Sequence, residues 1–292
     1  VERYSRRRAR FYQQRSSTRA PQRRPLSGWR AAVASIVCWL PVVLGFAIPA
    51  SQLLWWSIQK SEIWQQSAFW VLTFNTLWLG LLAALITVAL ALWLAYGRRR
   101  HPTRPLRAAI SLAGMGYAIP GIVIAVGLLS PLAWLDNQII TISEWLFNFN
   151  PGLLLSGTVI ALLFAYSVRF LSVSLQTVNS GLEQITPQMD DSARTLGASG
   201  KRILWRIHLP LLRSPLLAAL ILVLVDVMKE LPATLVLRPF DFNTLAVRAF
   251  EMASDERLAD AGPPALMIVA VGLIPVIMLS RALRSNSIKT GE

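Results

Sequence analysis

Long hydrophobic stretches alternate with short polar segments along the chain. A helix needs about 20 residues to cross roughly 30 Å of hydrocarbon, and six stretches reach that length. Helices satisfy their own backbone hydrogen bonds in lipid, and the alternating pattern of a membrane barrel is absent. The sequence therefore predicts an all-α, polytopic membrane protein with six transmembrane helices. The predicted spans are residues 31–58, 69–96, 108–135, 152–175, 215–237 and 264–283.

Composition agrees with this pattern. Hydrophobic residues make up 54% of the 292 residues and charged residues 15%, whereas soluble domains carry about 25% charged residues. The single cysteine, Cys38, lies in an apolar stretch, and His101 and His208 are far apart in sequence. We therefore expect no disulfide framework, no metal site, no cofactor and no catalytic residues.

The basic residues mark an orientation in the membrane. The net charge of +14 does not indicate nucleic acid, because the basic residues cluster at the ends of apolar stretches. They gather in residues 1–30, 97–107, 169–214 and the C-terminal tail, whereas residues 136–151 carry no Lys or Arg. The positive-inside rule then places both termini in the cytosol and residues 136–151 outside.

The first 30 residues contain ten arginines. This segment is too long and too basic for the n-region of a signal peptide. We interpret residues 1–30 as a cytosolic connector with affinity for anionic lipid, followed by a six-span domain over residues 31–284 and a cytosolic tail over residues 285–292. The first residue is Val rather than Met, which suggests a piece of a longer chain.

Residues 179–214 form the most polar segment between two predicted spans, and they read as two short helices. Thr186 can cap the first helix with Pro187 at its first position. Gly197 can end that helix in a left-handed conformation. We expect the second helix over residues 199–208, ended by Leu209-Pro210 because proline cannot continue the hydrogen-bond ladder. The segment either packs on its own bundle or fits a groove on a partner.

Two short motifs in this segment resemble a known loop. Asp191-Ser192-Ala193, three residues and Gly197 are followed after nine residues by Ile207-His208-Leu209-Pro210. This spacing resembles the EAA loop of ABC-importer permeases, with Asp in place of Glu and Ser in place of the first Ala. The resemblance implies a type I (MetI-like) permease fold in a bacterial inner membrane. It also implies docking of an ATPase on Asp191, Ser192, Ala193, Gly197, Ile207, Leu209 and Pro210.

The same resemblance implies the partners. These are a homodimeric ATPase subunit that hydrolyses ATP, a substrate-binding protein and a second six-span permease half. Gly197-Ala198-Ser199-Gly200-Lys201-Arg202 looks like the end of a phosphate-binding loop. It has Thr195 where the first Gly belongs and Arg202 where Ser or Thr belongs, so we do not expect this chain to bind ATP.

Charged residues near the end of the fifth predicted span are candidates for the translocation path. Asp226, Lys229 and Glu230 are spaced to share one face of a helix, and ionisable residues in membrane spans are functional candidates. The alternative is a local ion pair near the outer interface, where Lys229 can snorkel.

The cargo is suggested by a second resemblance. Residues 228–240, 244–248 and 255–261 are similar to ferric-iron importer permeases, which are usually fused dimers. The chain is then the second half of such a protein, and ferric iron is the expected cargo. Phosphonate, polyamine, thiamine or sulfate remain alternatives. Half of a secondary transporter and a membrane anchor with a basic tail are two further interpretations.

Overall fold

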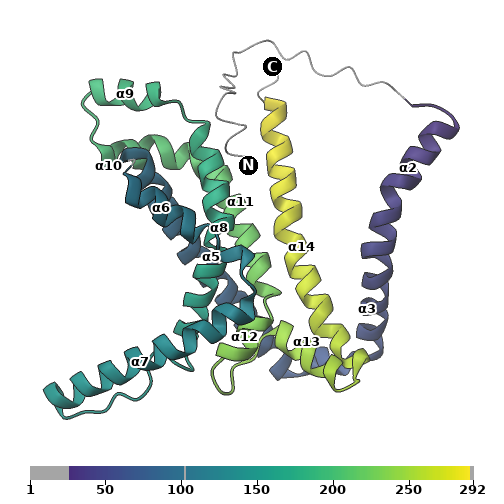
Figure 1. Ribbon diagram of the computed structural model, residues 1–292. Helices are drawn as coiled ribbons and strands as arrows, with labels where there is room; N and C mark the ends of the chain where they lie inside the picture. Colours follow the sequence, from purple (N-terminus) through teal and green to yellow (C-terminus); the bar gives the residue numbers. More distant parts are fainter. Residues whose placement is uncertain (1–25, 102, 290–292) are drawn as a thin grey trace. The chain divides into compact units, whose positions relative to one another are not determined.

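The computed structural model describes residues 26–101 and 103–289. Within these residues every regular element is helical, and six helices are long and apolar enough to cross a membrane. This confirms the all-α fold class and the six predicted spans. The chain falls into two units, one ending at Pro49 and the other beginning at Ala50, and Figure 1 shows the helices of each.

The described part of the first unit consists of α2 (Trp29–Val42), the π-helical turn η2 (Val43–Ala47) and the start of α3 (Ile48–Gln59). No residue of α2 is buried. Its tryptophan, leucine, isoleucine and valine side chains are exposed, so this helix presents an apolar surface on all sides.

The second unit is a bundle around three long helices, α5, α8 and α11. Its core combines large side chains such as Tyr166 and Phe170 with alanines at the helix contacts. Small residues allow the helix backbones to approach closely. At Gly181, for example, an added Cβ would lie 2.7 Å from Pro215.

After α3 the helices are α4 (Glu62–Gln65), α5 (Ser67–Arg100), α6 (Arg104–Ala113), η3 (Gly116–Ala118), α7 (Gly121–Phe147), α8 (Val159–Glu183), α9 (Pro187–Thr195), α10 (Gly200–Ile203), η4 (Leu204–His208), α11 (Leu209–Met228), α12 (Pro232–Leu237), α13 (Leu245–Ser254) and α14 (Leu258–Lys289).

The third span differs from its prediction. The apolar stretch at residues 108–135 is interrupted at residues 114–120, so α6 is a separate helix and α7 forms the span. Pro120 precedes α7 in an extended conformation. Gly116 lies so close to α8 that an added Cβ would collide with the Val168 carbonyl oxygen. Backbone approach of this kind needs glycine.

Residues 136–147, expected in an outside loop, belong instead to the last part of α7. Asp136 is fully buried and accepts backbone N–H groups from Leu154, Leu155 and Ser156 at 3.0, 2.8 and 2.7 Å. A carboxylate can accept several such bonds at once. Asp136 therefore fastens the segment after α7 to the helix itself.

The fifth span also has different limits. Leu209-Pro210 does not end the second loop helix, because the chain stays helical from Gly200 to Met228. The π-helical turn η4 precedes Pro210, which lies in the first turn of α11. The π-helical turn changes the hydrogen-bond register just before Pro210, and local adjustments of this kind accommodate a proline within a continuous helix. The predicted 215–237 span is in turn two helices, α11 and α12.

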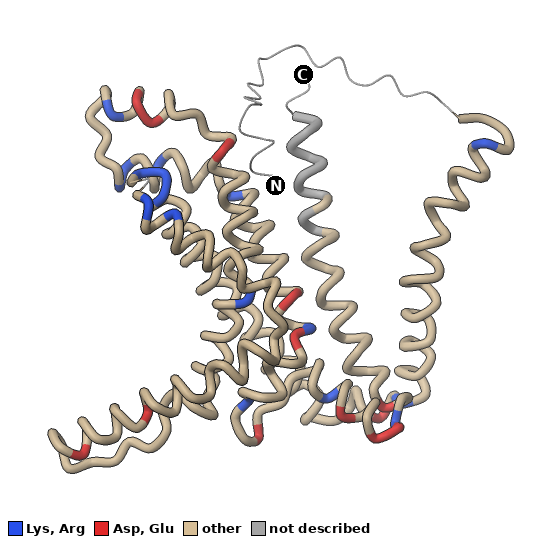
Figure 2. Tube along the Cα trace, in the orientation of Figure 1, with Lys and Arg blue, Asp and Glu red and all other residues tan. Residues whose placement is uncertain are grey.

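The two ends of the second unit differ in charge. Figure 2 shows Lys and Arg gathered where α5 ends and α10 begins, and the last turn of α5 alone carries Arg98, Arg99 and Arg100. At the α13 end acidic residues accompany the basic ones. Ion pairs there include Lys60–Asp260, Arg257–Asp260, Arg238–Glu251 and Arg248–Glu251.

We expect Asp136→Ala to lower the free energy of unfolding by about 2 kcal/mol, because it removes a buried carboxylate that accepts three backbone N–H groups. Thermal unfolding of the detergent-solubilised protein measures this loss. Glu144→Ala is the matched control, since Glu144 accepts from Asn150 in an exposed position. Equal effects of the two substitutions would contradict a special role for Asp136.

Candidate functional site

The segment between α8 and α11 forms a protruding pair of helices. Thr186 precedes α9 in an extended conformation, and Pro187 is the first residue of the helix. Gly197 adopts φ +78°. The N–H of Gly197 bonds to the Arg194 carbonyl, and the N–H of Ala198 bonds to the Ala193 carbonyl, both at 2.9 Å. This confirms the predicted end of the first helix at Gly197, where glycine accepts a left-handed conformation that other residues avoid.

The phosphate-loop-like residues form the corner between the two helices. Ser199 precedes α10, and its hydroxyl accepts the Arg202 N–H at 3.4 Å. The segment thus joins one helix to another, whereas a phosphate-binding loop joins a strand to a helix.

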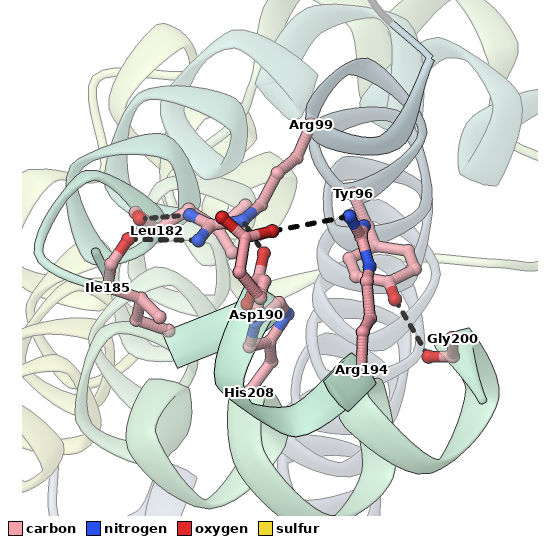
Figure 3. Close-up of polar contacts among 9 residues, drawn as sticks. Tyr96, Arg99, Leu182, Ile185, Asp190, Arg194, Gly200 and His208 are labelled. Carbon is pink, nitrogen blue, oxygen red and sulfur yellow. Dashed lines mark hydrogen bonds and ion pairs between the residues drawn. The ribbon is translucent and has the colours of Figure 1, made fainter. Parts of the chain in front are cut away.

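A cluster of three polar side chains holds this loop on the bundle. Arg99 of α5 donates from Nε to Asp190 Oδ2 at 2.9 Å, and Asp190 Oδ1 lies 2.7 Å from His208 Nε2. Arg99 also donates from its two Nη atoms to the carbonyl oxygens of Leu182 and Ile185 at 2.8 and 2.9 Å. Figure 3 shows that Arg99 thereby reaches both the end of α8 and α9. We call Arg99, Asp190 and His208 the anchoring cluster.

The electrostatics of the anchoring cluster favour ionised Asp190. Partial burial alone would raise the pKa of Asp190, but the hydrogen bonds from Arg99 and His208 outweigh it and hold the pKa below its usual value of 3.8. Stabilisation of this kind is complete at neutral pH and is lost as the pH falls through the folded-state pKa. His208 is buried and stacks edge-on with Tyr96 at 5.6 Å, so its ring is fixed as well.

Asp190 and Asp191 lie on different faces of α9. Asp190 and the buried Ala193 are three residues apart and both lie on the shielded side of the helix, as helical periodicity requires. The Asp191 side chain is 70% exposed and forms a 3.6 Å ion pair with Arg194. Motif matching indicated Asp191 and missed Asp190, His208 and Arg99. The helical period of the acidic pair could have identified Asp190, but nothing local indicated Arg99.

An apolar groove of about 460 Å³ lies between α9 and the start of the fifth span. Its walls come from α9 and from the start of the fifth span, and they include three of the predicted residues, Ser192, Ala193 and Ile207. Leu196 at its edge is 87% exposed. The other predicted residues do not line it: Gly197 turns the chain with its positive φ, Leu209 is half-buried and Pro210 is exposed in the first turn of α11. Its lining residues are Thr186, Gln188, Met189, Ser192, Ala193, Leu196, Ile207 and Leu211.

The three charged residues at the end of the fifth span do not form one cluster. Asp226 pairs with Lys229 at 2.8 Å, and the Lys229 side chain is 61% exposed. Glu230 is buried, and its carboxylate pairs with Arg169 instead. The prediction that all three share a helix face is wrong for Glu230, because α11 ends at Met228 and the chain leaves the helical register there.

Arg169 is a second correction. The charge pattern assigned it to the cytosolic polar segment, but it lies well inside α8. Its Nε is 3.3 Å from Glu230 Oε2. A membrane-spanning arginine is costly unless it is paired, and the partner, 61 residues further along the chain, could not be identified from the sequence.

These features define a class of protein: a polytopic helical membrane domain with a protruding helical loop between its fourth and fifth spans. Residues 87–289 match the family of binding-protein-dependent transport system inner membrane components. The chain belongs to this family, and its fold is that of an ABC-importer permease.

Relatives and a solved structure agree with this assignment. The chain is 29% identical over 242 residues to the Fe(3+)-transport system permease protein FbpB 2 of Haemophilus influenzae, covering 82% of this chain and 45% of that protein. It is 27% identical over 214 residues to a putative 2-aminoethylphosphonate transport system permease protein of Salmonella typhimurium, covering 73% and 75%. The chain thus spans less than half the length of the first of these relatives.

A third relative is the thiamine transport system permease protein of Escherichia coli, 29% identical over 218 residues that cover 70% of this chain and 38% of that one. The fold is also similar to a bacterial ABC transporter involved in the import of alginate. That similarity has a TM-score of 0.69 at 14% identity and covers 88% of this chain and 96% of that one.

We predict that Asp190→Asn loosens the loop, because it removes the charge that Arg99 and His208 share. Amide hydrogen exchange in residues 186–199 should rise about tenfold at neutral pH, which corresponds to a loss of about 1.4 kcal/mol in local stability. Asp191→Asn is the control and should leave exchange unchanged. In the wild type, protection of the loop relative to the intrinsic exchange rate at each pH should fall in the same way only when the pH falls below about 3.8. A loop that is equally protected in Asp190→Asn would contradict the anchoring role.

Proposed function

We propose that this chain is the permease half of an ATP-driven importer and that its loop at residues 186–210 receives a separate ATPase subunit. The groove beside α9 supports this most directly. It exposes Leu196, Met189 and Leu211, although a polar segment facing water has no need of an apolar surface. An apolar groove on a firmly held helix pair suits a partner's side chains.

The anchoring cluster suits the loop to transmit force. A docking helix that could slide on its own bundle would absorb the motion of its partner. Arg99 bonds to the end of α8 and to α9 together, so a displacement of α9 also displaces α8 and α5. ATP binding to a homodimeric ATPase then shifts the permease between inward-open and outward-open conformations.

The orientation follows from the charge distribution. The loop end of the second unit carries the excess of Lys and Arg, including Arg98, Arg99 and Arg100, which favours the cytosol, and both termini of the chain are assigned to that side. A pocket of about 620 Å³ near the α13 end is lined by charged residues including Lys60, Arg248 and Arg257. We assign this end to the outer face, where a substrate-loaded binding protein delivers the cargo.

A second six-span half completes the proposed pathway. Every side chain of α2 is unburied within its own unit, and the first relative is more than twice as long as the matched region. Both observations support a fused two-half permease. Lipid covers the remaining apolar surface.

Ferric iron is the proposed cargo, because two relatives are named as ferric transport permeases. Phosphonate and thiamine are the alternatives that other relatives support. The path is proposed to pass the end of α11, where Asp226, Lys229 and Glu230 lie.

The ATPase contact is tested by Leu196→Asp, which places a charge in the groove. We expect ATP-driven uptake by the reconstituted complex to fall at least tenfold and the ATPase subunit to be lost on purification. Thr195→Asp adds the same charge one residue away, outside the groove lining, and should change uptake less than threefold. ATP-dependent uptake that survives Leu196→Asp would refute this docking site, and uptake driven by an ion gradient without ATP would indicate a secondary transporter.

The cargo is tested in the same proteoliposomes with the full chain, its ATPase and its binding protein. Radiolabelled ferric iron should accumulate only with ATP and should not be displaced by 2-aminoethylphosphonate or thiamine. Asp226→Asn should raise the KM for the cargo severalfold while the complex still assembles. Accumulation of one of the other solutes instead of iron would overturn the cargo assignment, and an unchanged KM would remove Asp226 from the path.

A further inference from the structure

Two interruptions in the helices of the second unit meet on the same helix, α8. The first interruption is residues 114–120, between α6 and α7, and the second is residues 229–231, between α11 and α12. Gly116 packs against the backbone of Val168, and Gly121 packs against the side chains of Arg169 and Glu230. Breaks in spanning helices are where such helices bend and move.

The Arg169–Glu230 pair holds both interruptions at once. Glu230 Oε2 is 3.3 Å from Arg169 Nε, and Glu230 Oε1 accepts the N–H of Ala233 at the start of α12 at 3.3 Å. An added Cβ at Gly121, the first residue of α7, would collide with both Arg169 Nη1 and Glu230 Oε1. The pair therefore lies where α7, α8 and α12 converge.

A second contact from the same side of α8 strengthens this junction. Tyr166 lies three residues before Arg169, nearly one helical turn, and its hydroxyl shares a 2.6 Å hydrogen bond with Thr234 Oγ1. Thr234 Oγ1 in turn lies 2.6 Å from the Glu230 carbonyl oxygen. Both Tyr166 and Thr234 are fully buried, so α8 and the α11–α12 break are joined by a buried polar network.

The pair is incompletely satisfied in this conformation. Arg169 Nε and Nη1 are buried and have no hydrogen-bond acceptor among the described residues, and the Nε–Oε2 contact is long for a charged pair. Buried donors without acceptors are rare in proteins and call for an explanation. Within the described residues, the pair is thus held by one long ion-pair contact, whose geometry can change when α8 moves.

α8 connects this junction to the loop at residues 186–210, which we call the docking loop. The helix is continuous from Val159 to Glu183, and about 20 Å of it separates Arg169 from Leu182 at a rise of 1.5 Å per residue. The Leu182 carbonyl is bonded by Arg99 of the anchoring cluster. Because α8 is rigid between Arg169 and Leu182, a movement of one of these residues along the helix axis also moves the other.

We propose that Arg169 and Glu230 are a positioning pair through which α8 transmits the motion of the docking loop to the two helix interruptions that border the path. This inference rests on the proposed function. Because Arg169 neutralises the Glu230 carboxylate, the pair acts on the walls of the path rather than as a ligand for the cargo. Coupling of this kind needs an energetic test, since proximity alone does not establish it.

The test compares Arg169→Gln, Glu230→Gln and the double variant in the complete reconstituted complex. Each single variant is expected to lower the maximal uptake rate at least tenfold with the KM for the cargo changed less than twofold. ATP hydrolysis should persist, so that the cargo moved per ATP falls. The double variant should be no worse than either single variant, because the two residues act as one unit, and Arg169→Lys should recover part of the rate.

A pair of glycine variants keeps the test decisive if the charge variants fail to assemble. Gly121→Ala forces the pair apart and should uncouple transport in the same way. Gly127→Ala on the same helix has open space around it and should behave as wild type. A rise in KM for Glu230→Gln alone, additive effects in the double variant, or normal coupling in Gly121→Ala would each overturn the inference.

The two proposals fail differently. If the wild-type complex shows no ATP-driven uptake, the proposed function is wrong. If the wild-type complex transports normally, Leu196→Asp loses the ATPase, and the Arg169 and Gly121 variants still move the normal amount of cargo per ATP, only the positioning pair is refuted.

Discussion

Hydrocarbon offers no hydrogen bonds, and every backbone polar group inside it has to find a partner within the protein. This constraint accounts for the long helices α5, α7, α8, α11 and α14. It also means that any break in those helices needs a specific replacement for the lost backbone bonds. The most informative parts of this protein are therefore the places where a spanning helix stops.

Charged side chains supply hydrogen bonds to the backbone groups at these breaks. An ionised side chain bonds to an unpaired backbone N–H or C=O group more strongly than a neutral side chain does. Asp136 serves the three N–H groups that follow α7. Glu230 accepts a hydrogen bond from the Ala233 N–H in the first turn of α12, and Arg169 balances the charge of its carboxylate. Arg99 donates hydrogen bonds to the carbonyl groups at the end of α8. Charges in this protein thus support the backbone as well as set its orientation.

The docking loop has one set of residues that attaches it to the bundle and another that is exposed. Asp190 and His208 hold it to α5 and, through Arg99, to the end of α8 by close contacts. Leu196 and the apolar groove are left open on the other side of α9. In the proposed function, this firm attachment lets the loop pass the motion of an ATPase to the membrane helices.

The sequence by itself determined the helical class, the six spans, the loop between the fourth and fifth spans and the glycine that ends its first helix. These features depend on hydrophobic length and on local backbone preferences, which neighbouring residues decide. Only the tertiary structure decided where helices break inside apolar stretches, that Pro210 is passed without a break, and that Asp190 and Glu230 find Arg99 and Arg169. Gly116 and Val168 are 52 positions apart, and the two ion pairs join residues 61 and 91 positions apart. A linear pattern does not encode which distant groups will meet.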